Sequence, residues 1–314
     1  MAAVIAAAEG GVAAAAGFTS ASSAATTFQA AIDWAAPTVS GATISPTSGG
    51  AAVGSPGFLH QGGLYRLYAN IVDSNSGVAS ATASLLNLSG SGSSTVSLFR
   101  GTYGVGGTTF NFASTEQTAL ALLPEGARQF TVTAADNAGN ATTATYSVMV
   151  DNTSPSGSDI QTVNATSGTN GHPEVGDKVI YTFSEPIAPT SILAGWDGSS
   201  TNVVFRFLNG NPTDSFAVYN ASNSTQLPLG LVNTGKKYVT GTVNFGATGT
   251  PSTMVQSGST ITVTLGTADN LNAASSANGG VNMTWTPSSA ATDRAANPLL
   301  PTAVLESGVG DLDF

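Results

Sequence analysis

Alternation between apolar and polar residues over positions 129–150 constrains the fold of this chain more than any other feature. The apolar positions recur every second residue, at Phe130, Val132 and Ala134 and then at Ala144, Tyr146, Val148 and Val150. Successive side chains of a strand point to opposite faces, so this period predicts two half-buried β-strands. The intervening Asp136-Asn-Ala-Gly-Asn140 has the residues of a tight turn. We therefore predict a β-hairpin, ended by Pro155 because proline cannot donate to a ladder.

The turn motif recurs near the other end of the chain, and a similar Pro-containing segment occurs near its start. Asp293-Arg-Ala-Ala-Asn297 repeats the Asp-x-Ala-x-Asn pattern, and Trp34-Ala-Ala-Pro37 is similar to the Pro-containing segment that ends at Pro155. These repeats predict an N-terminal segment over residues 1–36, a first β-domain over 37–154 and a larger second β-domain over 155–314.

Short alternating runs separated by turn residues fill both predicted domains. The clearest are residues 65–71 in the first domain and 175–186, 203–208 and 261–265 in the second. Turns every eight to twelve residues are typical of a β-sandwich. Residues 189–193 are compatible with one helical turn.

Composition limits the classes of function. Charged residues make up only 8% of the chain and the formal net charge is −10, which argues against binding to nucleic acid or to an anionic membrane. No cysteine is present, so disulfides and thiolate metal sites are excluded. Residues 1–16 are too short and too weakly apolar for a transmembrane helix, and no basic residue precedes them as in a complete signal peptide. The composition favours an extracellular β-protein.

Three motifs carry a resemblance to known proteins. Asp136-Asn-Ala-Gly-Asn140 and Asp151-Asn-Thr-Ser-Pro155 resemble the last hairpin and the linker of bacterial immunoglobulin-like surface repeats. Tyr181-Thr-Phe-Ser-Glu-Pro186 is similar to a strand of another set of such repeats. The resemblance implies an all-β protein with two immunoglobulin-like sandwiches in tandem after an extended N-terminal segment.

The segment before the first domain carries a second resemblance. Phe28-Gln-Ala-Ala-Ile-Asp-Trp-Ala-Ala-Pro37 resembles the start of secreted actinobacterial proteins of the SipW-dependent, TasA/camelysin-like kind. That family includes fibre-forming matrix proteins, so the resemblance implies secretion and a role in assembly.

The N-terminal segment has two interpretations. It is either an arm without a partner or a strand that completes the sheet of a neighbouring subunit, in which case Val4, Ile5, Val12 and Phe18 are the candidate donor residues. The second interpretation predicts a surface fibre or pilus-like filament, with copies of the chain as partners. The alternative is an adhesin or carbohydrate-binding module for cell-surface glycans, with Tyr103 and Trp196 as the candidate stacking residues. The competing interpretation of Trp196 is that it packs at the edge of the core.

Catalytic patterns are missing from the sequence. His60 and His172 both lie in Gly/Pro-rich loops without a second histidine at ligand spacing, and no nucleophile elbow, phosphate loop or zinc-protease motif occurs. We expect a protein that is not an enzyme and needs no organic cofactor.

Calcium is the one cofactor for which candidate ligands exist. Asp136, Asn140, Asp151 and Asn152 offer side-chain oxygens at loop ends, and Ca²⁺ prefers oxygen ligands. The competing interpretation is that Asp136 and Asn140 only build their turn. An internal Lys–Asn isopeptide bond is a further alternative, with Lys178, Lys236 and Lys237 as the available amines.

Overall fold

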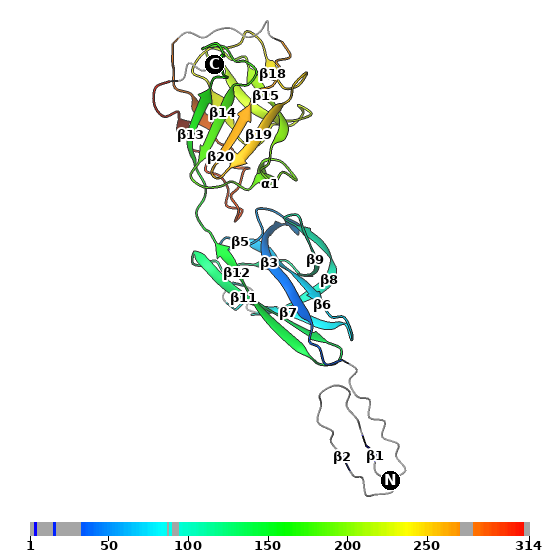
Figure 1. Ribbon diagram of the computed structural model, residues 1–314. Helices are drawn as coiled ribbons and strands as arrows, with labels where there is room; N and C mark the ends of the chain where they lie inside the picture. Colours follow the sequence, from blue (N-terminus) through cyan, green and yellow to red (C-terminus); the bar gives the residue numbers. More distant parts are fainter. Residues whose placement is uncertain are drawn as a thin grey trace.

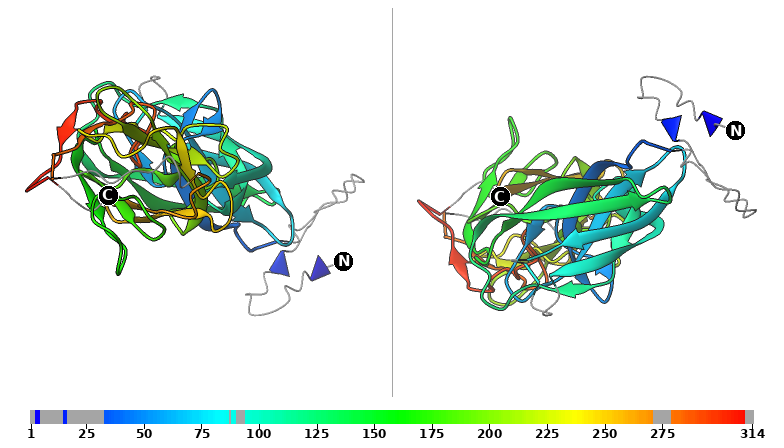
Figure 2. Two further views of the ribbon diagram at one scale, coloured as in Figure 1. Left: turned by 90° about the horizontal axis from the view of Figure 1, so that it is seen from above. Right: turned by 90° about the horizontal axis from the view of Figure 1, so that it is seen from below.

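The computed structural model describes residues 33–86, 88–89, 94–270 and 279–310, and the backbone pairing of residues 3–4 with 15–16. Two all-β domains lie end to end, with β12 leading out of the first domain and β13 opening the second (Figure 1). Seen along the long axis, the two domains overlap in projection (Figure 2). The predicted all-β class and the two-domain arrangement are confirmed.

The first domain is a sandwich with the sheet order β4-β3-β6-β9-β8-β7-β11-β12-β5, in which β10 also pairs with β6. Its strands are β3 (Thr38–Ser48), β4 (Ala51–Ala52), β5 (Phe58–Leu59), β6 (Leu64–Val72), β7 (Val78–Ser84), β8 (Thr95–Val105), β9 (Thr108–Ser114), β10 (Gln117–Thr118), β11 (Gly126–Asp136) and β12 (Ala141–Val150).

The predicted hairpin is β11–β12. Phe130 pairs with Tyr146 across the ladder, and their rings stack with centroids 5.9 Å apart. Phe130, Val132 and Ala134 are buried, as their alternation predicts. On its other side β11 pairs with β7, so this hairpin forms one wall of the core.

Strand β12 keeps most of one edge open. Within the described chain, its outer side pairs only with β5, at Met149 and Val150. Residues 141–147 therefore direct backbone groups away from the sheet, as an edge strand does.

The second domain has the order β13-β14-β20-β19-β15-β16-β17-β21-β22, with β18 beside β15. Its elements are β13 (Gly157–Val163), β14 (Lys178–Phe183), α1 (Pro189–Ile192), β15 (Thr201–Leu208), β16 (Ser215–Asn220), β17 (Leu231–Asn233), β18 (Val243–Phe245), β19 (Ser252–Ser257), β20 (Thr260–Thr264), β21 (Thr284–Thr286) and β22 (Val304–Leu305).

This sheet curls into a nearly closed, barrel-like form instead of the second immunoglobulin-like sandwich that the motifs suggest. The side chain of Gln161 at the end of β13 donates to the carbonyl of Ser307, which follows β22, and so draws the two edges together. Gly157 allows a close approach of β13, because a Cβ there would lie 2.7 Å from the buried Trp285 ring. Trp285 packs edge-on against Tyr181 and Phe183 at the centre of this core.

The predicted donor segment is described only in part. Residues Ala3–Val4 (β1) pair with Ala15–Ala16 (β2), and Ile5, Val12 and Phe18 lie outside the described residues. Among the described residues the one helix, α1, has four residues, which is too short to cross a bilayer.

Candidate functional site: carboxylate clusters at the domain ends

The first closing turn (residues 136–140) is built around one buried carboxylate. Asp136 Oδ1 accepts the N–H groups of Ala138 (2.9 Å) and Asn140 (2.8 Å), and its Oδ2 accepts the side-chain amide of Asn140 at 2.8 Å. The same amide donates to the carbonyl of Asp33 at 3.1 Å. The turn thus holds the first linker (residues 33–37) against the end of β11.

The second closing turn (residues 293–297) repeats these contacts. Asp293 accepts the N–H and the side-chain amide of Asn297, each at 2.8 Å, and this amide also donates to the carbonyl of Asp151 at 2.9 Å. Asp151 stands four residues before Pro155, as Asp33 does before Pro37. The two linker–turn units are therefore equivalent, although the domains differ in their sheets.

One backbone position distinguishes the two turns. Ala296 has φ of 71°, whereas its counterpart in the first turn is Gly139 at 95°. A left-handed conformation costs an L-residue about 1 kcal/mol relative to glycine. We expect Ala296→Gly to raise the free energy of unfolding of the second domain by about 1 kcal/mol, measured by urea denaturation.

Gly139→Ala is the matched control for that substitution. A Cβ at Gly139 has no atom within 4 Å, so only the backbone conformation is penalised. We expect a loss of about 1 kcal/mol in the first domain. If Gly139→Ala stabilised its domain, or Ala296→Gly did not raise the free energy of unfolding, the left-handed conformation of Ala296 would not be the source of strain.

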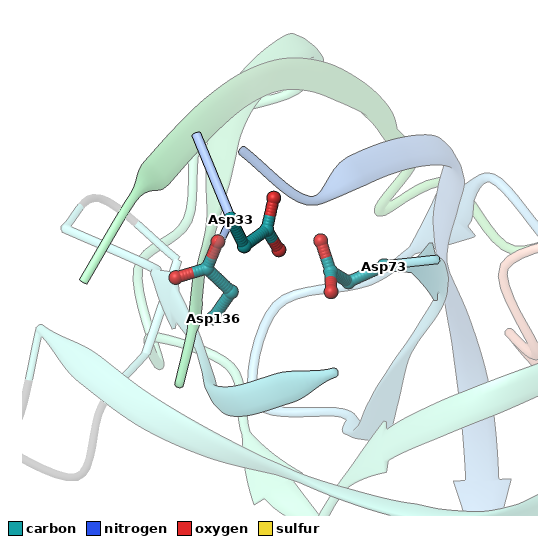
Figure 3. Close-up of side chains that lie close together, drawn as sticks. All are labelled: Asp33, Asp73 and Asp136. Carbon is teal, nitrogen blue, oxygen red and sulfur yellow. The ribbon is translucent and has the colours of Figure 1, made fainter. Parts of the chain in front are cut away.

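Three carboxylates meet beside the first closing turn. Asp33 from the linker, Asp73 after β6 and Asp136 at the end of β11 point toward one another (Figure 3) and have ligand oxygens within 4.8 Å of each other. Asp33 accepts the N–H groups of Ala35 and Ser76, each at 2.9 Å. These hydrogen bonds lower the pKa of Asp33 to about 2.

Asp136 in this cluster is also held ionised. Burial by itself would raise the pKa of Asp136, but the hydrogen bonds from Asn140, Ala138 and Gly139 outweigh burial and lower it. Asp73 accepts the N–H groups of Asn75 and Gly77. Hydrogen-bond donors thus stabilise the anionic forms of Asp33 and Asp136.

A second cluster occupies the same place in the second domain, at its junction with the first. Asp151 from the second linker (residues 151–155), Glu185 after β14 and Asp293 have ligand oxygens within 4.8 Å of one another. Burial, and then the charges of Asp151 and Asp293, raise the pKa of Glu185 to about 7. Burial also raises the pKa of Asp293, with the charge of Asp151 acting in the same direction.

The clusters differ in the direction in which the pKa values of their carboxyl groups are shifted. The Lys237–Asp214 ion pair and the contact of His172 with Glu174 lie outside both clusters. Because Glu185 is repelled by Asp151 and Asp293, the second cluster favours a bound proton or a cation more than the first does. Three convergent carboxylates are a donor set that suits Ca²⁺.

The four predicted calcium ligands do not come together. Asp136 and Asn140 lie in the first cluster, whereas Asp151 lies in the second, at the opposite end of β12. Asn152 is engaged elsewhere, since its Oδ1 accepts the N–H of Gln61 (2.7 Å) and its amide donates to the carbonyl of Leu123 (2.8 Å). These four residues therefore do not share one site, and binding of Ca²⁺ to either cluster stays a prediction.

Sequence reasoning missed four of the six cluster residues: Asp33, Asp73, Glu185 and Asp293. Asp33 and Asp293 had a usable signal, because they stand in the repeated linker and turn motifs that contain Asp151 and Asp136. Asp73 and Glu185 had none, since their position beside the turn follows only from the pairing of β6 with β3 and of β14 with β13.

The second closing turn also docks on the first domain. The carbonyl of Arg294 accepts the N–H of Ser55 at 2.7 Å, and the Arg294 guanidinium lies 5.6 Å from the centre of the Phe58 ring. Gly54 permits this approach, because a Cβ there would stand 2.6 Å from the Arg294 carbonyl. The domains are thus joined by direct contacts as well as by the linker.

Comparison with known proteins identifies one of the two domains. Residues 36–152 match the family model of the bacterial Ig-like domain. The first domain is an Ig-like domain. No curated protein and no solved structure gave a significant match to the chain. The likeness of residues 28–37 to TasA/camelysin-like proteins stays a prediction.

The two candidate sugar-stacking residues have different surroundings. Trp196, in the second domain, is only 5% exposed and its indole N–H donates to the carbonyl of Ser199, so it is a core residue with no open ring face. Tyr103, in the Ig-like domain, is half-buried and meets Tyr68 edge-on at 6.1 Å. A stacking role stays a prediction for Tyr103 alone.

An internal isopeptide bond needs a lysine that faces an asparagine beside a buried acid, and Lys237 has both kinds of neighbour. Its amine contacts the side-chain oxygen of Asn209 and lies 2.7 Å from the carbonyl of Gly210 and 3.2 Å from the buried carboxylate of Asp214. Three oxygen acceptors satisfy the three protons of an ammonium group, which leaves no lone pair for attack. Lys178 is exposed.

We therefore expect Lys237 to remain an ion-pair partner of Asp214. The intact mass of the protein should equal the sum of its residues, and should not be lower by the about 17 Da of a lost ammonia. A mass deficit of that size that disappears in Lys237→Arg would instead establish the cross-link.

Proposed function

We propose that this chain is an extracellular structural protein of a bacterial surface, and specifically a rod-like subunit of a surface fibre. The Ig-like domain is of a kind typical of surface proteins. The observation that carries the proposal is the set of hydrogen bonds at the junction between the domains. The Asn297 side chain donates to the linker carbonyl of Asp151, and the Arg294 carbonyl accepts the N–H of Ser55. Such contacts suit a subunit whose two domains keep a fixed arrangement along its length.

Assembly by donor-strand exchange is the route we propose within this function. The outer edge of β12 over residues 141–147 offers the backbone groups that an added strand would bond. The donor would be the N-terminal segment of another copy, with Val4, Ile5, Val12 and Phe18 as its apolar residues. Low charge on the chain reduces repulsion between closely packed copies.

Negative-stain electron microscopy of the full chain and of a version without residues 1–27 tests this route. We expect filaments from the full chain and single particles from the truncated chain. Because the truncation keeps residues 33–37, both linker–turn units remain, and circular dichroism should confirm that it folds. Filaments from both forms would overturn donor-strand exchange, and single particles from both would overturn the fibre function.

A cleft in the second domain favours glycan adhesion as the second candidate. Its lining includes Pro189, Asp197, Ser199, Gln256 and Arg294, whose polar groups suit the hydroxyls of a sugar. Glycan-array binding that is lost in Asp197→Ala but kept in a Tyr103→Ala control would favour this candidate and place the ligand in the cleft.

A further inference from the structure

Within the part of the chain that the structure describes, one linker–turn unit is docked on a neighbouring domain, and its equivalent is not. In the second unit, the residue after the linker aspartate is Asn152, which bonds Gln61 and Leu123 of the first domain. In the first unit the same position is Trp34, whose side chain is 82% exposed. The first unit therefore presents to solvent the surface with which the second unit contacts its neighbour.

The turns differ in the same way. Arg294, the second residue of the docked turn, lies over Phe58, whereas its counterpart Asn137 is exposed. We call the surface formed by Trp34 and Asn137 the head of the molecule. Large aromatic residues anchor protein interfaces, so Trp34 beside the undocked turn is the candidate anchor of the head.

Exposed valines occur at the opposite end of the molecule, on the second domain. Val163 ends β13, Val175 precedes β14, and Val281 and Val309 lie where the backbone of Gly310 packs against Val281. β13 leaves the junction at Ser156 and runs away from it (Figure 1), so its last residue, Val163, lies at the distal end. Val175 lies near that end because it precedes β14, which pairs with β13, and Val309 lies there because Gln161 of β13 bonds Ser307. We call this surface the tail. Its exposed valines are the apolar side chains that an aromatic anchor from another molecule would contact.

We propose that the head of one molecule docks on the tail of a second copy, through Trp34 and the first closing turn, so that the end-to-end stacking of the two domains continues between molecules. The inference rests on the proposed fibre function and supplies its longitudinal contact. Head and tail are different surfaces at opposite ends, so the contact is heterologous and does not close on itself.

Tryptophan fluorescence reports this contact directly in the full chain. Of the three tryptophans, Trp196 and Trp285 are buried, so quenching by acrylamide reports mainly on Trp34. We expect quenching to fall and emission to shift to shorter wavelength as the protein concentration rises, while sedimentation shows larger species. Trp34→Ser should weaken association on the order of 30-fold or more, the effect of removing an interface anchor.

Mixing two variants tests the polarity of the contact. Trp34→Ser keeps a working tail and Val175→Asp keeps a working head, so each alone should be monomeric and their mixture should form dimers that grow no further. Association that is abolished by Trp34→Ser but not affected by Val175→Asp or Val309→Asp would indicate a symmetric head-to-head contact and would overturn the inference. So would a wild-type chain that stays monomeric with Trp34 fully quenched.

The version without residues 1–27 separates this contact from donor-strand exchange, because it retains Trp34. If it associates and Trp34→Ser does not, the head–tail contact stands, and the fibre is built without an exchanged strand. If it fails to associate while Trp34→Ser still assembles, the head–tail contact is wrong and the fibre function survives. Loss of association in both variants would assign assembly to both contacts.

Discussion

Asn297→Ala is expected to destabilise the second domain by about 2–3 kcal/mol and to loosen its junction with the first. The buried amide donates to the Asp293 carboxylate and to the Asp151 carbonyl, and its removal leaves both acceptors without that partner. For a domain of this size, the loss corresponds to a fall of roughly 5–10 °C in the midpoint of its calorimetric transition.

Asn140→Ala is the matched control, because it removes the equivalent amide from the first closing turn. It should lower the midpoint of the Ig-like domain by a similar amount and leave the junction intact. Small-angle X-ray scattering should show a larger radius of gyration for Asn297→Ala only. Equal scattering curves for both variants would mean that the linker does not depend on Asn297.

Raising the pH from about 5 to about 8 is expected to weaken the junction. The pKa of Glu185 is raised to about 7, above its ordinary value of 4.5, first by burial and then by the charges of Asp151 and Asp293. The folded state therefore binds this proton more tightly than the unfolded state does. The resulting stability is fully present below pH 4.5 and is lost as the pH rises through 7.

Screening by water limits the size of this effect to about 1 kcal/mol, since Glu185 is only partly buried. Urea denaturation of the second domain across this pH range measures it, and Glu185→Gln should flatten the curve because an amide does not titrate. Asp33 contributes with the opposite sign: its pKa is lowered to about 2, so its contribution is present above its ordinary 3.8 and is lost as the pH falls through 2. A wild-type curve that is flat between pH 5 and 8 would contradict the assignment to Glu185.

Millimolar Ca²⁺ is expected to offset the loss at high pH. A divalent cation relieves the repulsion among Asp151, Glu185 and Asp293, and extracellular sites of this donor type bind in the range of about 10⁻⁴–10⁻³ M. The midpoint of the second domain at pH 8 should rise with Ca²⁺ in the wild type and rise less in Glu185→Gln. An equal rise in both would point to a general ionic effect.

The turns and the faces of the hairpin were predictable because their causes are local. Alternation placed Phe130 and Val132 inside, and the Asp-x-Ala-x-Asn spacing predicted both closing turns. A carboxylate four residues before an asparagine can accept that residue's own backbone N–H, so no distant strand is needed to form the turn. Local patterns of this kind are the part of the fold that a single sequence specifies.

The carboxylate clusters and the shape of the second sheet depend on distant partners. Glu185 meets Asp293 across more than a hundred residues, and no spacing in the sequence predicts that distance. The curling of β13 toward β22 likewise depends on Gly157 lying against Trp285, which a strand pattern does not indicate. The sequence left Trp196 with two interpretations, sugar stacking or packing at the edge of the core, and its burial favours the second.

The hydrogen bond from the Asn297 side chain to the carbonyl of Asp151 has a consequence for a molecule under tension. A force along the long axis acts first on the linker. Two hydrogen bonds attach the linker to the second domain: this one, and the one from Leu300 N–H to the carbonyl of Pro155. The linker lengthens only when these bonds break, and they can re-form once the load is removed, because both partners stay on folded domains. The junction would then act as a reversible extension element that yields before either β-sheet does.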